Sequence, residues 1–99
     1  MALAIDLSTA QFSWTWAQGV GGAATGFEIG LGSSTGTYTT LKPVVLSART
    51  LPVNQAVSVP GTYFAAIRSV GAVLKSPWSN EVTFQAEIAP VAPTGFAVA

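Results

Sequence analysis

The stretch "PGTYFAAIRSV", Pro60–Val70, decides the fold, because its side chains alternate between two faces of an extended chain. The two faces carry, in turn, Tyr63, Ala65, Ile67 and Ser69, then Phe64, Ala66, Arg68 and Val70. A period of two is typical of a half-buried β-strand, whereas a helix repeats its apolar residues every three or four positions. The stretch therefore predicts a strand whose first face packs into a core.

The same alternation recurs along the chain. Further alternating stretches are separated by Gly-rich and Ser-rich turns and lie at Leu3–Leu7, Phe12–Trp16, Phe27–Leu31 and Val82–Phe84. Thr37–Thr40 predicts a short edge strand, and Leu41–Ser58 has mixed periodicity. Pro43 and Pro52 lack an N–H donor, so each belongs on an edge strand or at a strand start. About seven short strands predict an all-β fold, a two-sheet antiparallel β-sandwich.

The chain of 99 residues has room for one domain. We expect the sandwich to occupy residues 1–87 and an extended C-terminal tail to occupy residues 88–99. Two prolines stiffen this tail, and Phe96 and Val98 are exposed unless something covers them. Two explanations stay open: the tail folds back on its own domain, or it adds as a strand to a neighbouring subunit or partner.

The composition excludes several classes of partner. Charged residues make up 8% of the chain, against about 25% in an average soluble domain. Four basic and four acidic residues balance, so no net field attracts nucleic acid or an anionic membrane. The uncharged segment Leu7–Phe27 contains Gly, Ser, Thr and Gln, which argues against a membrane helix. The N-terminal stretch lacks a basic n-region and has Asp6 in place of an apolar core, so we expect no cleaved secretory signal.

Four motifs, in this order, carry a resemblance to a known family: "FSWTW", "TGFEIGLGSSTGTY", "PGTYFAAIRSV" and "SPWSNEV". Over about Leu3 to Ala86 the chain resembles a fibronectin type III domain of the bacterial and phage type. The resemblance implies an immunoglobulin-like topology, with Trp14 as the core Trp. It also implies that Tyr63 is a tyrosine corner, whose hydroxyl bonds the backbone upstream. Members of the family are in general spacers, adhesion modules or protein-binding modules without catalytic activity.

Side-chain parity and this resemblance assign two sets of residues. The predicted structural core contains Trp14, Tyr63, Ile67, Trp78, Val82 and Phe84. Outward aromatics and the apolar tail are typical of interfaces. The candidate partner contacts are Phe64, Arg68, Trp16, Phe96 and Val98.

No pattern in the sequence predicts catalysis. The resemblance implies that the third, sixth and seventh strands are neighbours, so Glu28, Arg68 and Glu81 are expected to form an acid-base-acid row, in which the arginine lowers the pKa of both carboxyls. A general acid needs the opposite shift. The chain has no His, so only Lys42 or Lys75 could activate a serine nucleophile. We expect no catalytic residue, no metal site and no cofactor.

These observations predict a non-enzymatic structural protein of a bacteriophage virion, made in the host cytoplasm. A surface covered by other virion proteins or neighbouring copies needs few charges, so a capsid decoration or cement protein is expected first and a tail-associated module next. The alternative is a spacer or an adhesion or carbohydrate-binding module of a larger bacterial surface protein or secreted glycoside hydrolase. In that alternative, Trp16 would stack on a host-surface glycan.

Overall fold

The computed structural model describes residues 3–98 and contains seven β-strands and a single 3₁₀ turn over that range. The prediction of an all-β chain is confirmed. The strands are β1 (Leu3–Asp6), β2 (Gln11–Ser13), β3 (Ala24–Gly32), β4 (Thr40–Val45), β5 (Thr50–Pro52), β6 (Gly61–Gly71) and β7 (Val82–Glu87). The 3₁₀ turn (Val53–Gln55) follows β5.

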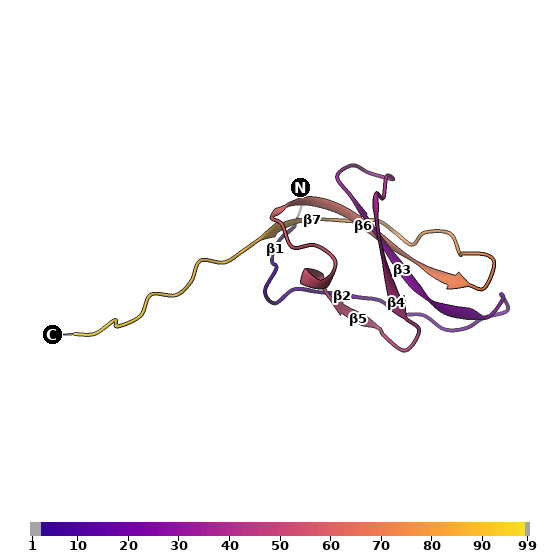
Figure 1. Cartoon of the computed structure of the whole chain (residues 1–99), viewed down its shortest axis with the longest axis horizontal. Helices are drawn as coiled ribbons and strands as arrows, with labels where there is room; N and C mark the ends of the chain where they lie inside the picture. The colour runs from indigo at the N-terminus through magenta and orange to yellow at the C-terminus, as the bar shows by residue number, and fades with distance from the viewer. Residues whose placement is uncertain (1–2, 99) are drawn as a thin grey trace.

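The strands form two sheets. A five-stranded sheet has the order β1-β7-β6-β3-β4, and β2 pairs with β5 in a separate two-stranded sheet. In Figure 1 the two-stranded sheet lies below the large one, and the core lies between them. The large sheet is mixed, because β1 runs parallel to β7, with Leu3 beside Phe84 and Asp6 beside Glu87. The expectation of purely antiparallel sheets is therefore wrong for β1.

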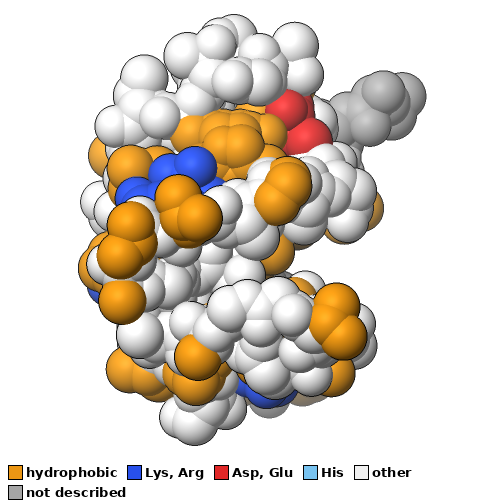
Figure 2. Space-filling view, turned by 90° about the vertical axis from the view of Figure 1, so that its right-hand side faces the viewer, with side chains coloured by type: hydrophobic (Ala, Val, Ile, Leu, Met, Phe, Trp, Pro, Cys, Tyr) orange, Lys and Arg blue, Asp and Glu red, His pale blue; other side chains and the backbone are white. Residues whose placement is uncertain are grey.

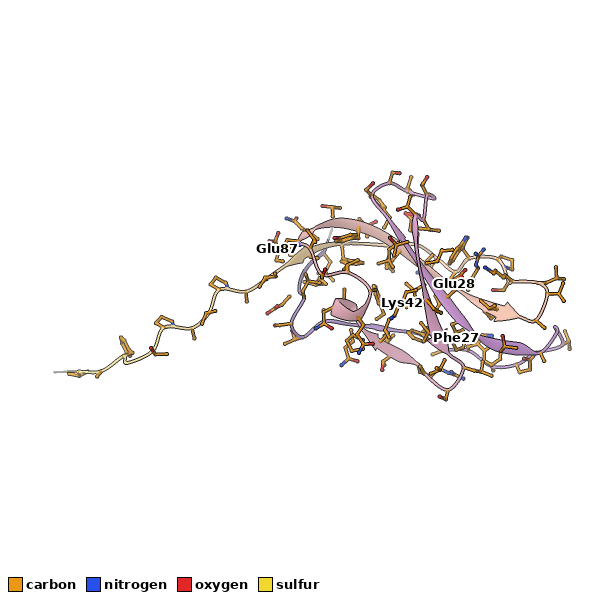
Figure 3. The ribbon with its side chains drawn as sticks, in the orientation of Figure 1. Phe27, Glu28, Lys42 and Glu87 are labelled. Atoms are coloured by element: carbon orange, nitrogen blue, oxygen red, sulfur yellow. The ribbon has the colours of Figure 1, made fainter. Side chains whose placement is uncertain are left out.

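The central pair, β3 and β6, has the faces that the sequence pattern predicts. Ile29 lies opposite Ile67, and Leu31 opposite Ala65, on the face toward the small sheet. In Figure 3, Phe27 lies on the side of β3 toward β2 and β5, and Glu28 lies on the other side. The buried core cluster consists of Leu7, Phe27, Ile29, Leu31, Val44, Leu51, Val53, Ala65, Phe84 and Ala86.

Four of the six predicted core residues lie where they were expected. Phe84 is buried, and Trp14, Tyr63 and Ile67 are partly buried against the core. The Tyr63 hydroxyl donates a hydrogen bond to the Val59 carbonyl at 2.6 Å, the upstream backbone bond that was expected. Val82 is 45% exposed, since it lies at the open side of the space between the sheets, so its assignment to the core is wrong.

Trp78 lies outside the core, on the outer face of the large sheet, which corrects the second core assignment. Ala65 pairs with Val82, but two residues further along β6 the backbone of Ile67 bonds Ser79. From the first contact to the second, the chain advances two residues on β6, from Ala65 to Ile67, but three on the other segment, from Val82 back to Ser79. This one extra residue is the mark of a β-bulge. Such a slip of one residue inverts every side chain beyond it. Extending the parity of β7 backward therefore gave the wrong face.

Both prolines lie where their missing N–H groups allow. Pro43 is on β4, an edge of the large sheet, and Pro52 ends β5 in the two-stranded sheet. The edge strand expected over Thr37–Thr40 begins only at Thr40. Thr37 instead closes a tight turn by bridging to Ser34.

The tail leaves the fold where β7 ends, at Glu87. It extends away from both sheets (Figure 1), and residues 88–98 are exposed. The radius of gyration is 16.8 Å, whereas a compact chain of this length has about 13 Å. The tail therefore does not fold back on its own domain in this structure.

Candidate functional site

The outer face of the large sheet carries an ion pair between two of the predicted residues. Arg68 donates from Nε and a terminal guanidinium nitrogen to Glu28 Oε1, at 2.9 and 2.7 Å. Lys75 adds longer contacts to the same carboxylate, at 3.3 and 3.4 Å. The hydrogen bonds from Arg68 hold the pKa of Glu28 below its ordinary value, against the opposing effect of burial.

Trp78 covers the Arg68 side of this ion pair, and Tyr38 packs against Trp78. The Arg68 guanidinium lies over the Trp78 ring, 4.0 Å from its centroid, and Tyr38 packs edge-on against the same ring at 4.8 Å. A methyl group on Gly30 would lie 2.8 Å from both aromatic side chains. Glycine at this position therefore lets the two rings lie directly on the strand. Figure 2 shows apolar, basic and acidic side chains next to one another on the upper layer.

Glu81 does not contact Arg68, so the predicted row of three charges is wrong at this end. Its carboxylate instead accepts hydrogen bonds from the Gly36 N–H at 2.9 Å, the Tyr38 hydroxyl at 2.9 Å and the Thr35 hydroxyl at 3.2 Å. These bonds, that of Gly36 first, lower the pKa of Glu81. Neither Glu28 nor Glu81 has the raised pKa that a general acid at neutral pH requires.

The other predicted contact residues have different surroundings. Phe64 is on the outer face as expected and is half-buried. Trp16 continues the inward parity of Phe12 and packs edge-on against Phe27 at 5.5 Å, with Arg49 over its ring. It is partly buried against the core, so its assignment as a partner contact is not supported. The tail residues Phe96 and Val98 are 97% and 96% exposed.

An open groove of about 540 Å³ lies between the two sheets, beside β2. Its upper wall comes from β3, β6, the first residue of β7 and the segment that leads into it, and its lower wall comes from β2 and the two residues after it. No residue of β4 or β5 lines it, so it is on the side of β2 away from β5. Figure 2 shows the molecule hollowed between an upper and a lower layer. The lining is Phe12, Ser13, Trp14, Thr15, Ile29, Ala65, Ala66, Ile67, Ser79, Asn80 and Val82.

The groove exists because of how β1 pairs. β1 lies beside the far end of β7, from Phe84 to Glu87, and so does not cover the second edge of β2. The sequence gives no signal for this choice, because β1 is an alternating apolar strand that could pair with either sheet. The groove was for this reason not predicted. The contacts of Tyr38 with Trp78 and Glu81 on the outer face were not predicted either.

Within residues 3–98, no cluster of three or more His, Cys, Asp or Glu side chains is placed to hold a metal ion. Over the same range, no helix is long and apolar enough to cross a bilayer. Comparisons with protein-family models, with curated proteins and with solved structures found no match to this chain.

Proposed function

We propose that this protein is a non-enzymatic structural module that acts through protein–protein contacts. One observation carries the proposal: the uncharged C-terminal tail, residues 88–98, extends away from both sheets, and its Phe96 and Val98 side chains are almost fully exposed. Exposed apolar surface of this kind marks interaction sites in soluble proteins. The ionised side chains of the outer face, in contrast, are occupied with one another and with backbone groups.

We propose further that the fold is an immunoglobulin-like sandwich of the fibronectin type III kind. The order β4-β3-β6-β7 opposite a sheet that contains β2 and β5 supports this, as does the hydrogen bond from Tyr63 to the upstream backbone. One feature departs from the pattern. In such folds the first strand lies beside the second, whereas here β1 lies beside β7.

As the setting of this module we propose a bacteriophage particle, on whose capsid or tail it contacts other virion proteins. The low content of charged residues and the exposed tail support an assembly in which neighbours cover much of the surface. A spacer or carbohydrate-binding role is the second candidate, but no observation favours it, since Trp16 packs inward.

Quantitative mass spectrometry of purified particles from a phage that encodes this chain tests the setting. We expect peptides from residues 3–98 at a copy number comparable with that of a capsid or tail protein. Particles that lack these peptides would contradict a virion role. Detection of the chain only within a larger cell-surface or secreted protein would instead establish the spacer alternative.

A further inference from the structure

We propose that the groove beside β2 binds the tail of a second copy of this chain, with residues 94–98 added as a strand to the free edge of β2. The proposal deepens the proposed function and rests on it, since it names the partner as another copy and the contact as strand addition. Three features carry it: the edge of β2 that no strand of residues 3–98 covers, the uncharged groove behind that edge, and the pattern of the tail.

Among residues 3–98, no strand pairs with the edge of β2 that faces away from β5. Trp14 N–H donates to the Arg49 carbonyl at 3.0 Å, and the Ala10 carbonyl accepts from Val53 N–H at 3.0 Å. In an antiparallel ladder the residues between these positions alternate in direction. The backbone N–H and C=O groups of Phe12 therefore also face β5. The N–H and C=O groups of Ser13 and of its odd-numbered neighbours face the opposite side.

The groove lies directly behind this edge, and its lining contains no charged residue. Its volume of about 540 Å³ falls within the range of about 300–1,000 Å³ that is typical of ligand pockets. Val82, which is 45% exposed at the open side, and the side chains of Phe12 and Ile67 give the space apolar walls. An added strand beside β2 would therefore direct alternate side chains toward Phe12, Ile67 and Val82, with Ser79 and Asn80 also in the lining.

The tail has the pattern that such an added strand needs. Phe96 and Val98 are two residues apart, so in an extended strand they lie on one face, with Ala97 on the other. Residues 88–99 contain no charged side chain, and neither does the lining of the groove. Pairing would bury two large apolar side chains that are now almost fully exposed. This is the usual form of strand addition, in which the backbone supplies pairing and alternate side chains fill pockets.

The tail is expected to reach another copy, because its direction takes it away from its own groove. The tail starts at the Glu87 end of β7, whereas the groove lies at the Val82 end. Pro90 and Pro93 favour an extended chain, which opposes the sharp reversal that binding in cis would need. Reciprocal exchange gives a closed dimer, and one-way exchange gives a head-to-tail chain of copies.

Sedimentation velocity of the full chain over a wide concentration range tests the association. We expect reversible self-association that Val98→Asp weakens by 10- to 100-fold or more, because a carboxylate would be buried in a groove that offers it no cationic partner. Val91→Asp is the matched control, since Val91 is 94% exposed and lies outside the proposed strand. It should associate like the unaltered chain. A chain that stays monomeric throughout, or association that is equal in the two variants, would overturn the proposal.

Cross-linking between single-cysteine variants tests the geometry, because the chain has no cysteine of its own. Ser13→Cys and Ala97→Cys should form a mixed disulfide when the two variants are combined under oxidation, since both side chains lie on the outward face of the joined strands. Ser33→Cys, at an exposed turn, replaces Ser13→Cys in the control mixture and should not cross-link. Cross-linking that is equally fast in both mixtures would contradict the assigned edge.

A double variant, Ser13→Cys with Ala97→Cys, distinguishes binding in trans from binding in cis. A covalent dimer or ladder is expected, whereas a monomer with an internal disulfide would show that the tail binds its own groove and would refute the exchange. These outcomes are independent of the virion test. A chain that is monomeric but present in particles would refute strand exchange and support the virion role. A chain that self-associates but is absent from particles would support strand exchange and refute the virion role.

Discussion

Replacing Tyr63 by Phe tests whether the bond between this residue and the upstream backbone stabilises the fold as the structure indicates. The change removes the hydroxyl that donates to the Val59 carbonyl at 2.6 Å. It leaves the ring, which stacks on Phe84 with 5.6 Å between the centroids. Only the hydrogen bond is therefore lost, and the packing of the core is kept.

The expected cost follows from the surroundings of the carbonyl. Val59 is exposed, so water can replace the lost hydroxyl and the full penalty of a buried unpaired group does not arise. We expect a loss of about 1 kcal/mol in the free energy of unfolding, the net value of one such bond. For a chain of this length this lowers the melting temperature by about 5 °C.

Urea denaturation followed by tryptophan fluorescence measures this loss as a shift of the midpoint at constant slope. Tyr38→Phe is the matched control on the outer face. Its loss should be equal or larger, because the Tyr38 hydroxyl is partly buried and donates to the Glu81 carboxylate, and a hydrogen bond to a charged group contributes more than one between neutral groups. An unchanged midpoint for Tyr63→Phe, or a loss for Tyr38→Phe that is smaller than the loss for Tyr63→Phe, would refute the reasoning.

Three further predictions concern packing and pH. Gly30→Ala should cost about 1–3 kcal/mol, because the new methyl group displaces the Trp78 ring; a thermal melt equal to that of the unaltered chain would contradict this. Leu31→Ala should cost about 2–5 kcal/mol in urea denaturation, since Leu31 is 1% exposed; a loss below 1 kcal/mol would show that its site is not packed. Arg68 lowers the pKa of Glu28 from its ordinary value of 4.5, so the ion pair stabilises the fold above that pH and is lost as the pH falls through the lowered pKa. Urea midpoints from pH 7 to pH 3 should therefore fall less in Glu28→Gln than in the unaltered chain, and equal slopes would exclude this contribution.

Local alternation in the sequence was sufficient to predict the faces of the central strands. Ile67 packs inward and Arg68 outward because each is fixed by its place in one uninterrupted strand. The outer position of Trp78 was not predictable in this way, because a bulge outside β7 inverts the parity. The partner of Glu81 was missed for a related reason: it lies on a turn that is distant in the sequence, and strand parity does not describe turns.

The groove illustrates a larger gap between sequence and structure. Its walls are ordinary alternating residues, and nothing in them indicates that one edge of β2 stays unpaired. That edge is free because β1 pairs with β7, a choice between two sheets that depends on contacts distant in the sequence. The exposure of Phe96 and Val98, in contrast, was foreseeable, because two prolines and a lack of polar partners set the tail apart.

The most direct test of the account is amide hydrogen exchange of β2, measured residue by residue by NMR on the full chain at low and at high concentration. We expect the amides of Phe12 and Trp14 to be protected throughout, since they face β5. The amides of Ser13 and Thr15 should exchange rapidly in the dilute chain and become protected as the chain associates. Protection of Ser13 and Thr15 in the dilute monomer, or rapid exchange that persists at high concentration, would contradict the claim that this edge is free and receives the tail of another copy.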